Sequence, residues 1–226
     1  MDVQPGPLIG RGRAADVYAA GPGLVLRRYR SRHDVLREAA VMQHVRAAGF
    51  PVPELVEASG PDLVMQRVDG PTMLADLARR PWRARAHART LAALHVRLAA
   101  VHAPAWLEAP FGEGDVVLHL DLHPDNVILT TAGPVVIDWT NARRGPAPVE
   151  VAHTWTLLAT ASPPKAIERI LAATFRRVFL STFLSGLDRE GARPHIAVVA
   201  RHRAADRNTL PAELRALERF VRRQAS

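Results

Sequence analysis

The stretch HLDLHPDNVIL, from His119 to Leu129, sets the question for the whole chain. It holds two histidines, two aspartates and one asparagine within eight residues and then becomes apolar. Two interpretations are open: a loop that happens to be polar, or an active site built where a buried strand begins. The remaining sequence has to decide between them.

The composition is that of a folded chain that buries a core of its own. Its 226 residues, 48% of them hydrophobic, suit one domain or two small lobes that share a cleft. Cysteine is absent, so disulfides and thiolate chemistry are excluded and a cytoplasmic protein is expected. The first residues do not resemble a signal peptide, and no apolar run reaches the length of a membrane span. We therefore expect no membrane partner.

The chain is basic, with a formal net charge of +8 carried almost wholly by arginine, since Lys165 is the only lysine. Such a balance permits binding to nucleic acid or to phosphorylated ligands. The arginines are spread along the whole chain, however, and are not interleaved with aromatic residues, which make up 5%. Genome composition explains them equally well, so nucleic acid is not the expected partner.

The expected elements divide the chain after residue 69. Strands are expected in the first part, at residues 7–18 as a hairpin and at 24–29, 54–58 and 63–68. The helix among them is predicted to begin with Ser31 as its cap and Asp34 in the capping-box position. Asp69-Gly70-Pro71 breaks the pattern, and helices dominate after it. The prediction is an N-terminal lobe at 1–69 and a C-terminal lobe at 70–226.

A hairpin is expected directly after the polar stretch, with two apolar runs on either side of the turn TTAGP. If it is centred on Ala132, Asn126 lies opposite Asp138, and the two Cβ atoms are about 5 Å apart on one face. An amide oxygen and a carboxylate so placed suit magnesium, and Asp121 lies on the loop that enters the same end. The prediction depends on the register, because a slip of one residue would place the two side chains on opposite faces.

The motif H-x-D-x-x-x-x-N at His119, Asp121 and Asn126, followed by I-D-W at Ile137 to Trp139, resembles the aminoglycoside phosphotransferase and choline kinase-like family. That family is a bacterial relative of the protein kinases, and the resemblance runs from about Leu8 to at least Ala152. It implies a two-lobed, protein kinase-like α+β fold with a small antiparallel-sheet N-lobe and a mainly helical C-lobe. It also implies ATP-dependent phosphoryl transfer to a hydroxyl group.

The same resemblance assigns roles within the motif. Asp121 would orient and deprotonate the acceptor hydroxyl, and Asn126 and Asp138 would hold the Mg²⁺ that accompanies ATP. His119 would be a structural brace, while His123 and Asp125 receive no chemical role. The spacing His119-x-Asp121-x-His123 also suits a zinc hydrolase, but histidine clusters elsewhere in the chain are lacking.

Upstream, GRGRAADV from Gly10 to Val17 is similar to the kinase glycine-rich loop, with Gly10, Gly12 and Val17 in the family positions and Ala15 in place of the third glycine. A plain hairpin turn is the alternative interpretation of this segment. On the next strand, alternation puts Val25 and Arg27 on one face, where Val25 would touch adenine and Arg27 would reach the phosphates.

Arg27 stands where the family normally has lysine, and this exchange is not conservative. Its natural partner is Glu38 on the following helix, although a solvent-facing glutamate is the alternative. The departure leaves open a pseudokinase or a nucleotide-binding regulatory module. The basic C-terminal helices leave open a nucleic-acid-associated protein.

The adenine pocket implied by the resemblance has a hinge and an apolar floor. Met65, Gln66 and Val68 resemble the hinge, whose backbone hydrogen-bonds adenine, and Ile128 would be the floor. All four are equally compatible with ordinary core positions.

The acceptor is expected to be a small molecule that carries a hydroxyl group. GPAPVEVAHTW, which follows Asp138 within a dozen residues, predicts a helix and leaves no room for the long segment with which protein kinases dock a peptide. From His153 onward there are thirteen lysine or arginine residues against six aspartate or glutamate residues. A neutral or anionic acceptor is therefore favoured over a polycationic one.

Overall fold

The computed structural model describes residues 4–12, 14–31, 34–160, 166–205 and 211–225. These residues form two compact units. Unit 1 runs to Pro71 and also contains Val127–Ala142, while unit 2 contains Thr72–Asn126 and everything described from Arg143 onward. The predicted lobe boundary after residue 69 stays a prediction, and the hairpin at 127–142 belongs to unit 1 by its contacts.

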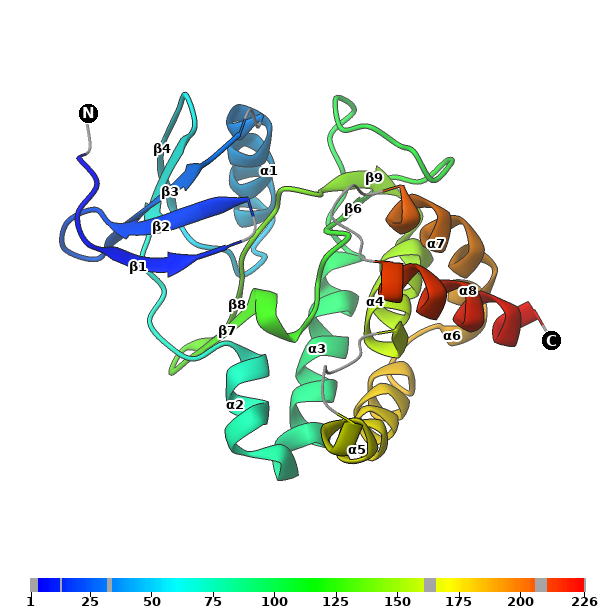
Figure 1. Cartoon of the computed structure of the whole chain (residues 1–226). Coiled ribbons are helices and arrows are strands. Elements are labelled where there is room, and N and C mark those ends of the chain that lie inside the picture. Colours follow the sequence, from blue (N-terminus) through cyan, green and yellow to red (C-terminus); the bar gives the residue numbers. More distant parts are fainter. Residues whose placement is uncertain (1–3, 13, 32–33, 161–165, 206–210, 226) are drawn as a thin grey trace. The chain divides into compact units, whose positions relative to one another are not determined.

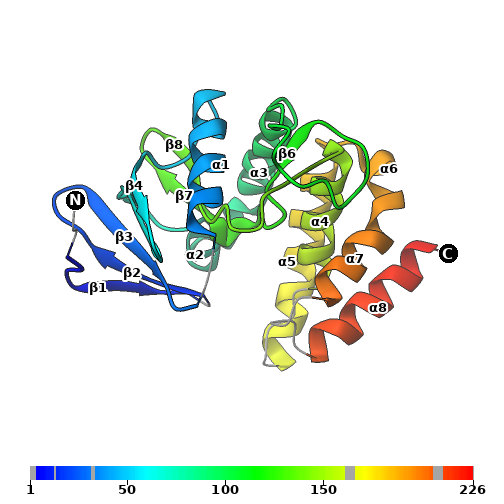
Figure 2. The same cartoon turned by 90° about the horizontal axis from the view of Figure 1, so that it is seen from above.

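Unit 1 is built on an antiparallel sheet with the strand order β1-β2-β3-β5-β4 (Figure 1). The strands are β1 Leu8–Arg11, β2 Ala15–Ala19, β3 Leu24–Tyr29, β4 Leu55–Ser59 and β5 Asp62–Gln66. Helix α1, Val35–Ala47, packs beside β4 and β5, as Figure 2 shows from above. The predicted strands and helix of this part are therefore present.

The start of α1 differs from the prediction. Asp34 is the N-cap, and its side chain accepts a hydrogen bond from the backbone N–H of Arg37 at 3.0 Å. The prediction that Ser31 caps the helix is wrong, because the helix begins at Val35 and the cap must lie directly before it. The helix ends before Gly49, whose φ of +79° suits a residue without a side chain.

The hairpin of unit 1 consists of β7, Val127–Thr130, and β8, Gly133–Val136. Val127 pairs with Val136, so the register is one residue short of the predicted one and its continuation would set Asn126 against Ile137. Asn126 itself closes the 3-10 turn η2, Pro124–Asn126, and Asp138 has a left-handed φ of +68°. The prediction that Asn126 and Asp138 are opposed residues of one hairpin face is therefore wrong.

Three contacts attach this hairpin to the rest of unit 1. Val136 N–H donates to the Pro51 carbonyl at 2.8 Å, and Leu129 N–H donates to the Pro71 carbonyl at 2.9 Å. Trp139, which is fully buried, packs edge-on against Phe50. The second hydrogen bond brings the chain so close that a Cβ on Gly70 would lie 2.1 Å from the Leu129 carbonyl oxygen.

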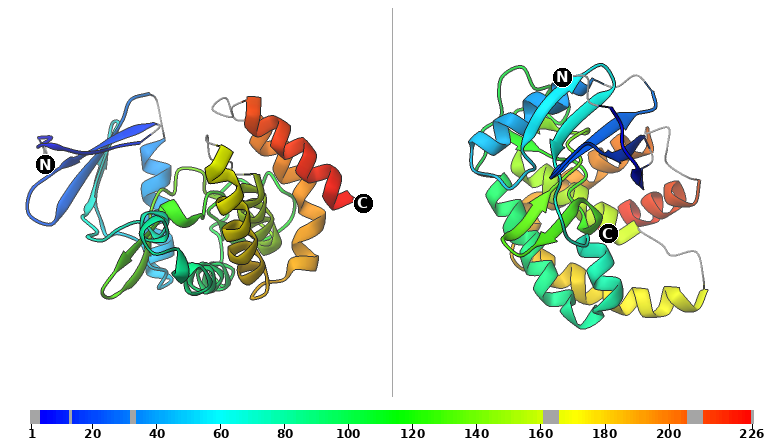
Figure 3. Two further views of the ribbon diagram at one scale, coloured as in Figure 1. Left: turned by 60° about the horizontal axis from the view of Figure 1, so that its bottom comes forward. Right: turned by 90° about the vertical axis from the view of Figure 1, so that its left-hand side faces the viewer.

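Unit 2 is mostly helical (Figure 1). Its elements are α2 Met73–Arg79, η1 Pro81–Arg83, α3 Ala84–Leu98, β6 Val116–Leu118, η2, β9 Arg143–Gly145, α4 Ala147–Thr160, α5 Ala166–Leu184, α6 Arg189–Ala192, η3 Arg193–His195, α7 Ile196–Ala204 and α8 Pro211–Ala225. Helix α3 packs along α5, and α4 contacts α7 and α8, which lie side by side in Figures 2 and 3. Among the described residues, no helix has the length and apolarity that crossing a membrane requires.

Candidate active site

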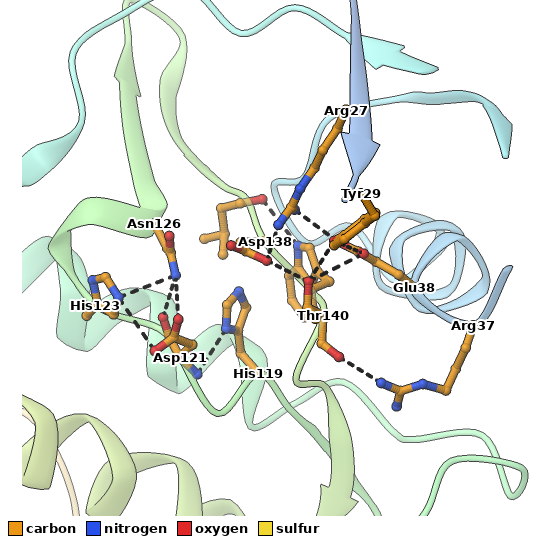
Figure 4. Close-up of polar contacts among 12 residues, drawn as sticks. Arg27, Tyr29, Arg37, Glu38, His119, Asp121, His123, Asn126, Asp138 and Thr140 are labelled. Carbon is orange, nitrogen blue, oxygen red and sulfur yellow. Dashed lines mark hydrogen bonds and ion pairs between the residues drawn. The ribbon is translucent and has the colours of Figure 1, made fainter. Parts of the chain in front are cut away.

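In unit 1, one arginine joins two carboxylates that are far apart in the sequence (Figure 4). Arg27, on β3, places Nη1 3.2 Å from Glu38 Oε1 on α1 and Nη2 2.7 Å from Asp138 Oδ1 after β8. Glu38 is only 1% exposed, so the alternative of a solvent-facing glutamate is wrong. The predicted partnership of Arg27 with Glu38 is present, and Asp138 joins it.

This arrangement keeps the guanidinium group charged. Burial alone would lower the pKa of Arg27, but the carboxylates of Asp138 and Glu38 outweigh it and raise that pKa above its ordinary value. A buried carboxylate such as Glu38 needs a cation nearby, since an unpaired buried charge is costly. Arg27 therefore supplies a permanent positive charge between two acidic groups.

Three further residues of this cluster were not predicted from the sequence. The Tyr29 hydroxyl donates to Glu38 Oε2 at 2.5 Å and lies 2.8 Å from Thr140 Oγ1, which in turn donates to Asp138 Oδ1 at 2.7 Å. Arg37 donates to the backbone carbonyls of Thr140 and Ala142 at 2.7 and 2.8 Å. Only Tyr29 had a usable signal, because strand alternation puts it on the same face as Arg27.

In unit 2, the polar stretch forms a loop that is held from several sides. Leu120 has a left-handed φ of +58°, and its N–H donates to Glu150 Oε2 on α4 at 2.9 Å. His119 is fully buried, and its Nδ1 accepts from the backbone N–H of Asp121 at 3.2 Å. Thr154, one turn beyond Glu150 on α4, donates to the Leu122 carbonyl at 2.9 Å. Helix α4 therefore fixes the backbone on both sides of Asp121.

The Asp121 side chain is held by its own loop (Figure 4). Asn126 Nδ2 donates to the Asp121 carbonyl at 2.9 Å and to Asp121 Oδ2 at 3.1 Å, and His123 Nε2 lies 3.5 Å from Asp121 Oδ1. Burial would raise the pKa of Asp121, but the hydrogen bond and charge of His123, with the charges of His119 and His153, lower it below its ordinary value. Asp121 is thus ionised at neutral pH, and His123 has an electrostatic effect that the sequence did not reveal.

Glu150 is the carboxylate beneath this loop. It is 4% exposed, and among the described residues its Oε1 has no hydrogen-bond partner. Burial raises its pKa to about 7, against the opposing effect of the backbone N–H groups around Leu120. Asp125, at the other end of the loop, is exposed and accepts from Thr72 Oγ1 at 2.9 Å.

The two predicted metal ligands have suitable donor atoms. Because both hydrogens of Asn126 Nδ2 point towards Asp121, the amide oxygen points away, and it accepts no hydrogen bond from any described residue. Asp138 offers a carboxylate that is 35% exposed. Amide and carboxylate oxygens are the ligand types that Mg²⁺ prefers. Across the described residues, no three histidine, cysteine or acidic side chains are grouped so that they could hold a metal ion.

The predicted nucleotide-binding residues all lie in unit 1. Gly10 and Gly12 lie at the β1–β2 hairpin, where Gly12 N–H donates to the Ala15 carbonyl at 2.8 Å, and Val17 and Val25 follow on β2 and β3. Met65 is buried and Gln66 is exposed at the end of β5, while Val68 and Ile128 are half-buried. Among the described residues, the backbone N–H and C=O of Val68 make no hydrogen bond, which suits an adenine-binding hinge.

The sequence and fold that carry these two clusters match a known protein family. The sequence profile of the phosphotransferase enzyme family matches residues 6–115 and 97–187, which together cover most of the chain. The chain belongs to this family. The resemblance to aminoglycoside phosphotransferases and choline kinases, and the predicted kinase-like α+β fold, are therefore confirmed.

Individual relatives are distant. A choline/ethanolamine kinase family protein from Mesorhizobium loti shares 15% identity and a TM-score of 0.59, over 97% of this chain and 87% of the other. Aminoglycoside phosphotransferase APH(2″)-IIa, solved with streptomycin and ATP, shares 12% identity and a TM-score of 0.60, over 89% and 84%. Thiamine kinase from Salmonella paratyphi B is 47% identical over 38 residues, a segment that spans 17% of this chain and 14% of the length of that relative.

Proposed function

We propose that the protein transfers the γ-phosphoryl group of ATP to a hydroxyl group of a small molecule. The observation that carries this proposal is the loop of unit 2, in which Asn126, His119 and Glu150 fix one ionised carboxylate, Asp121. A phosphotransferase needs one such group, held in place, to receive the acceptor proton. Family membership supports the reaction class, and APH(2″)-IIa in complex with ATP supports the choice of donor.

Asp121 is the proposed catalytic residue. Its carboxylate accepts a hydrogen bond from the acceptor hydroxyl and takes the proton as the hydroxyl oxygen bonds to the γ-phosphorus. The bond from that phosphorus to the bridging oxygen breaks, and ADP leaves. The lowered pKa makes Asp121 a weak base towards a free alcohol, so orientation of the hydroxyl is its main contribution until the proton becomes acidic in the transition state.

Binding of the nucleotide is proposed to use residues of the predicted N-terminal lobe at 1–69, with the two metal ligands from the remaining chain. Arg27, positioned by Glu38, neutralises phosphate charge, and Val68 offers its open backbone groups to adenine. Asn126 and Asp138 hold magnesium, which when bound would neutralise the charge of the β- and γ-phosphates. The catalytic and acceptor-binding lobe is proposed at 70–226.

The acceptor is proposed to be neutral or anionic rather than polycationic. Within unit 2, the basic groups that act on Asp121 are three histidines, His119, His123 and His153, and its acidic neighbour Glu150 is buried. Helix α7, which packs on α4, adds the charge of Arg203 close to His153. A polycation would meet these groups without the acidic surroundings that bind it.

The test is ADP release from magnesium–ATP across a panel of hydroxylated acceptors that are neutral, anionic or cationic. With an accepted substrate, Asp121→Asn should lower the rate about 100-fold or more, the usual contribution of a positioned base. Asp125→Asn, an exposed aspartate in the same loop, is the matched control and should retain the rate. A chain that binds no ATP would overturn the proposal.

A second candidate, a nucleotide-binding regulatory module, is favoured by one observation. Arg27, in place of the usual lysine, is bound directly to Asp138, the carboxylate proposed for magnesium. Binding of ATP with no turnover on any acceptor, together with no effect of Asp121→Asn, would select this candidate.

A further inference from the structure

Two hydroxyl groups lie between the carboxylates of Glu38 and Asp138, as Figure 4 shows. Tyr29 Oη is 2.5 Å from Glu38 Oε2 and 2.8 Å from Thr140 Oγ1. Thr140 Oγ1 is 2.7 Å from Asp138 Oδ1 and 3.4 Å from Glu38 Oε2. A series of close contacts therefore connects helix α1 with the segment after β8.

The protons in these contacts have a defined direction. An ionised carboxylate only accepts, so the Thr140 proton goes to Asp138 and the short contact with Glu38 is donated by Tyr29. Burial, followed by the charge of Glu38, raises the pKa of Tyr29 well above its ordinary value, so its hydroxyl keeps the proton. With the Tyr29 proton given to Glu38 and the Thr140 proton given to Asp138, no proton remains for the 2.8 Å contact between the two hydroxyl oxygens, so each hydroxyl fixes one carboxylate and the two side chains lie against each other.

The backbone around Thr140 is also fixed by hydrogen bonds. Its backbone carbonyl, and that of Ala142, accept hydrogen bonds from Arg37 on α1 at 2.7 and 2.8 Å. These bonds fix the backbone from which the Thr140 side chain reaches Asp138. Asp138, in contrast, is 35% exposed and has a left-handed backbone, a conformation that costs energy in a residue with a side chain.

We propose that Tyr29 and Thr140 are positioning residues that fix the Asp138 carboxylate and connect it to helix α1 for the binding of a divalent metal with ATP. The inference rests on the proposed function, in which Asp138 holds the metal and Arg27 neutralises phosphate. If Arg27 turns from Asp138 to a bound phosphate, the Thr140 hydroxyl is the contact that keeps Oδ1 in place. One carboxylate oxygen fixed in this way sets the plane of the carboxylate, and with it the direction of the second oxygen.

The experiment measures ATP binding by calorimetry in the full chain, with and without Mg²⁺, for Tyr29→Phe, Thr140→Val and the double variant. Loss of one hydrogen bond between neutral and charged groups should raise the Mg²⁺ concentration for half-maximal ATP binding by about fivefold or more. ATP affinity without metal should stay unchanged. Because the two hydroxyl groups are in contact, the double variant should change the Mg²⁺ dependence by less than the product of the two single effects.

Two controls separate positioning from general stability. Tyr18→Phe removes the hydroxyl of the other tyrosine of the chain and should leave the Mg²⁺ dependence unchanged. Thr140→Ser keeps the hydroxyl and should preserve the wild-type dependence, which also covers the case in which Thr140→Val fails to fold.

The outcomes that overturn the inference are distinct from failure of the proposed function. Equal loss of ATP affinity with and without Mg²⁺ would show a structural role alone. Multiplying effects in the double variant would show two independent contacts. If the wild-type chain binds no ATP under any condition, the proposed function fails first and the inference fails with it.

Discussion

Replacement of Glu150 by glutamine isolates the effect of one buried charge in unit 2. Glu150 Oε2 accepts from Leu120 N–H at 2.9 Å, and Oε1 has no partner among the described residues. Glutamine has the same shape and keeps an oxygen for the Leu120 N–H. The substitution therefore removes the negative charge and leaves the contact that holds the loop.

The magnitude follows from the pKa of Glu150, which burial raises from 4.5 to about 7. The folded state then retains a proton that the unfolded state releases, so the free energy of unfolding falls as the pH rises from about 4.5 to about 7. Each unit of pKa shift corresponds to about 1.4 kcal/mol, so at pH values above about 7 the buried charge lowers the free energy of unfolding by about 3 kcal/mol. Glu150→Gln should therefore be more stable than wild type by up to about 3 kcal/mol at high pH, and nearly equal to it at low pH.

Urea unfolding between pH 4.5 and 8.5 measures this difference. Trp155 lies on α4, the helix that carries Glu150, and is 3% exposed, so in a Trp139→Phe background the tryptophan fluorescence reports on unit 2. Glu113→Gln, at an exposed glutamate, is the control for loss of one negative charge on the surface. A gain in stability that is the same at every pH, or that Glu113→Gln also produces, would refute the reasoning.

Two other substitutions in unit 1 test the same kind of argument. Arg27→Met leaves Glu38 buried without its cation and should lower the free energy of unfolding by about 3–5 kcal/mol. Urea unfolding measures this loss, and Arg11→Met, at an exposed position, is the control. Gly70→Ala puts a Cβ 2.1 Å from the Leu129 carbonyl oxygen and should lower the melting temperature strongly. Gly21→Ala is the control for backbone strain alone, since Gly21 has a φ of +108° but a Cβ there meets nothing within 4 Å, and it should lower the melting temperature less.

The sequence was sufficient where short-range patterns determine the structure. Strand β3 has the bounds that its apolar run predicted, Leu24–Tyr29, because alternation and the flanking turns are local signals. The partnership of Arg27 and Glu38 was predictable only through the family resemblance, since eleven positions and a turn separate them. The cap of α1 was predicted wrongly, as Ser31 with Asp34 in the capping-box position, because both residue types suit a cap and only the observed helix start selects Asp34.

The register of the β7–β8 hairpin was not predictable, for a physical reason. The register of a hairpin is set by the conformation of its turn. The sequence of the turn did not distinguish a hairpin centred on Ala132 from the observed one, in which Val127 pairs with Val136. Tyr29 and Thr140 illustrate a second limit. Their contact joins positions separated by more than a hundred residues, and neither belongs to a motif that predicts it.

Two buried glutamates on helices perform comparable tasks in the two units with opposite electrostatic consequences. Glu38 on α1 is balanced by Arg27 and Tyr29, whereas Glu150 on α4 receives backbone N–H groups and has its pKa raised to about 7. Each glutamate serves a segment with a left-handed residue, and Leu120 and Asp138 are the non-glycine residues with positive φ in the described chain. Strain of this kind persists only where the surroundings fix the backbone. Above about pH 7 Glu150 therefore carries its charge at a cost in stability that a neutral residue would avoid, and that cost falls on α4, the helix that fixes the loop of Asp121.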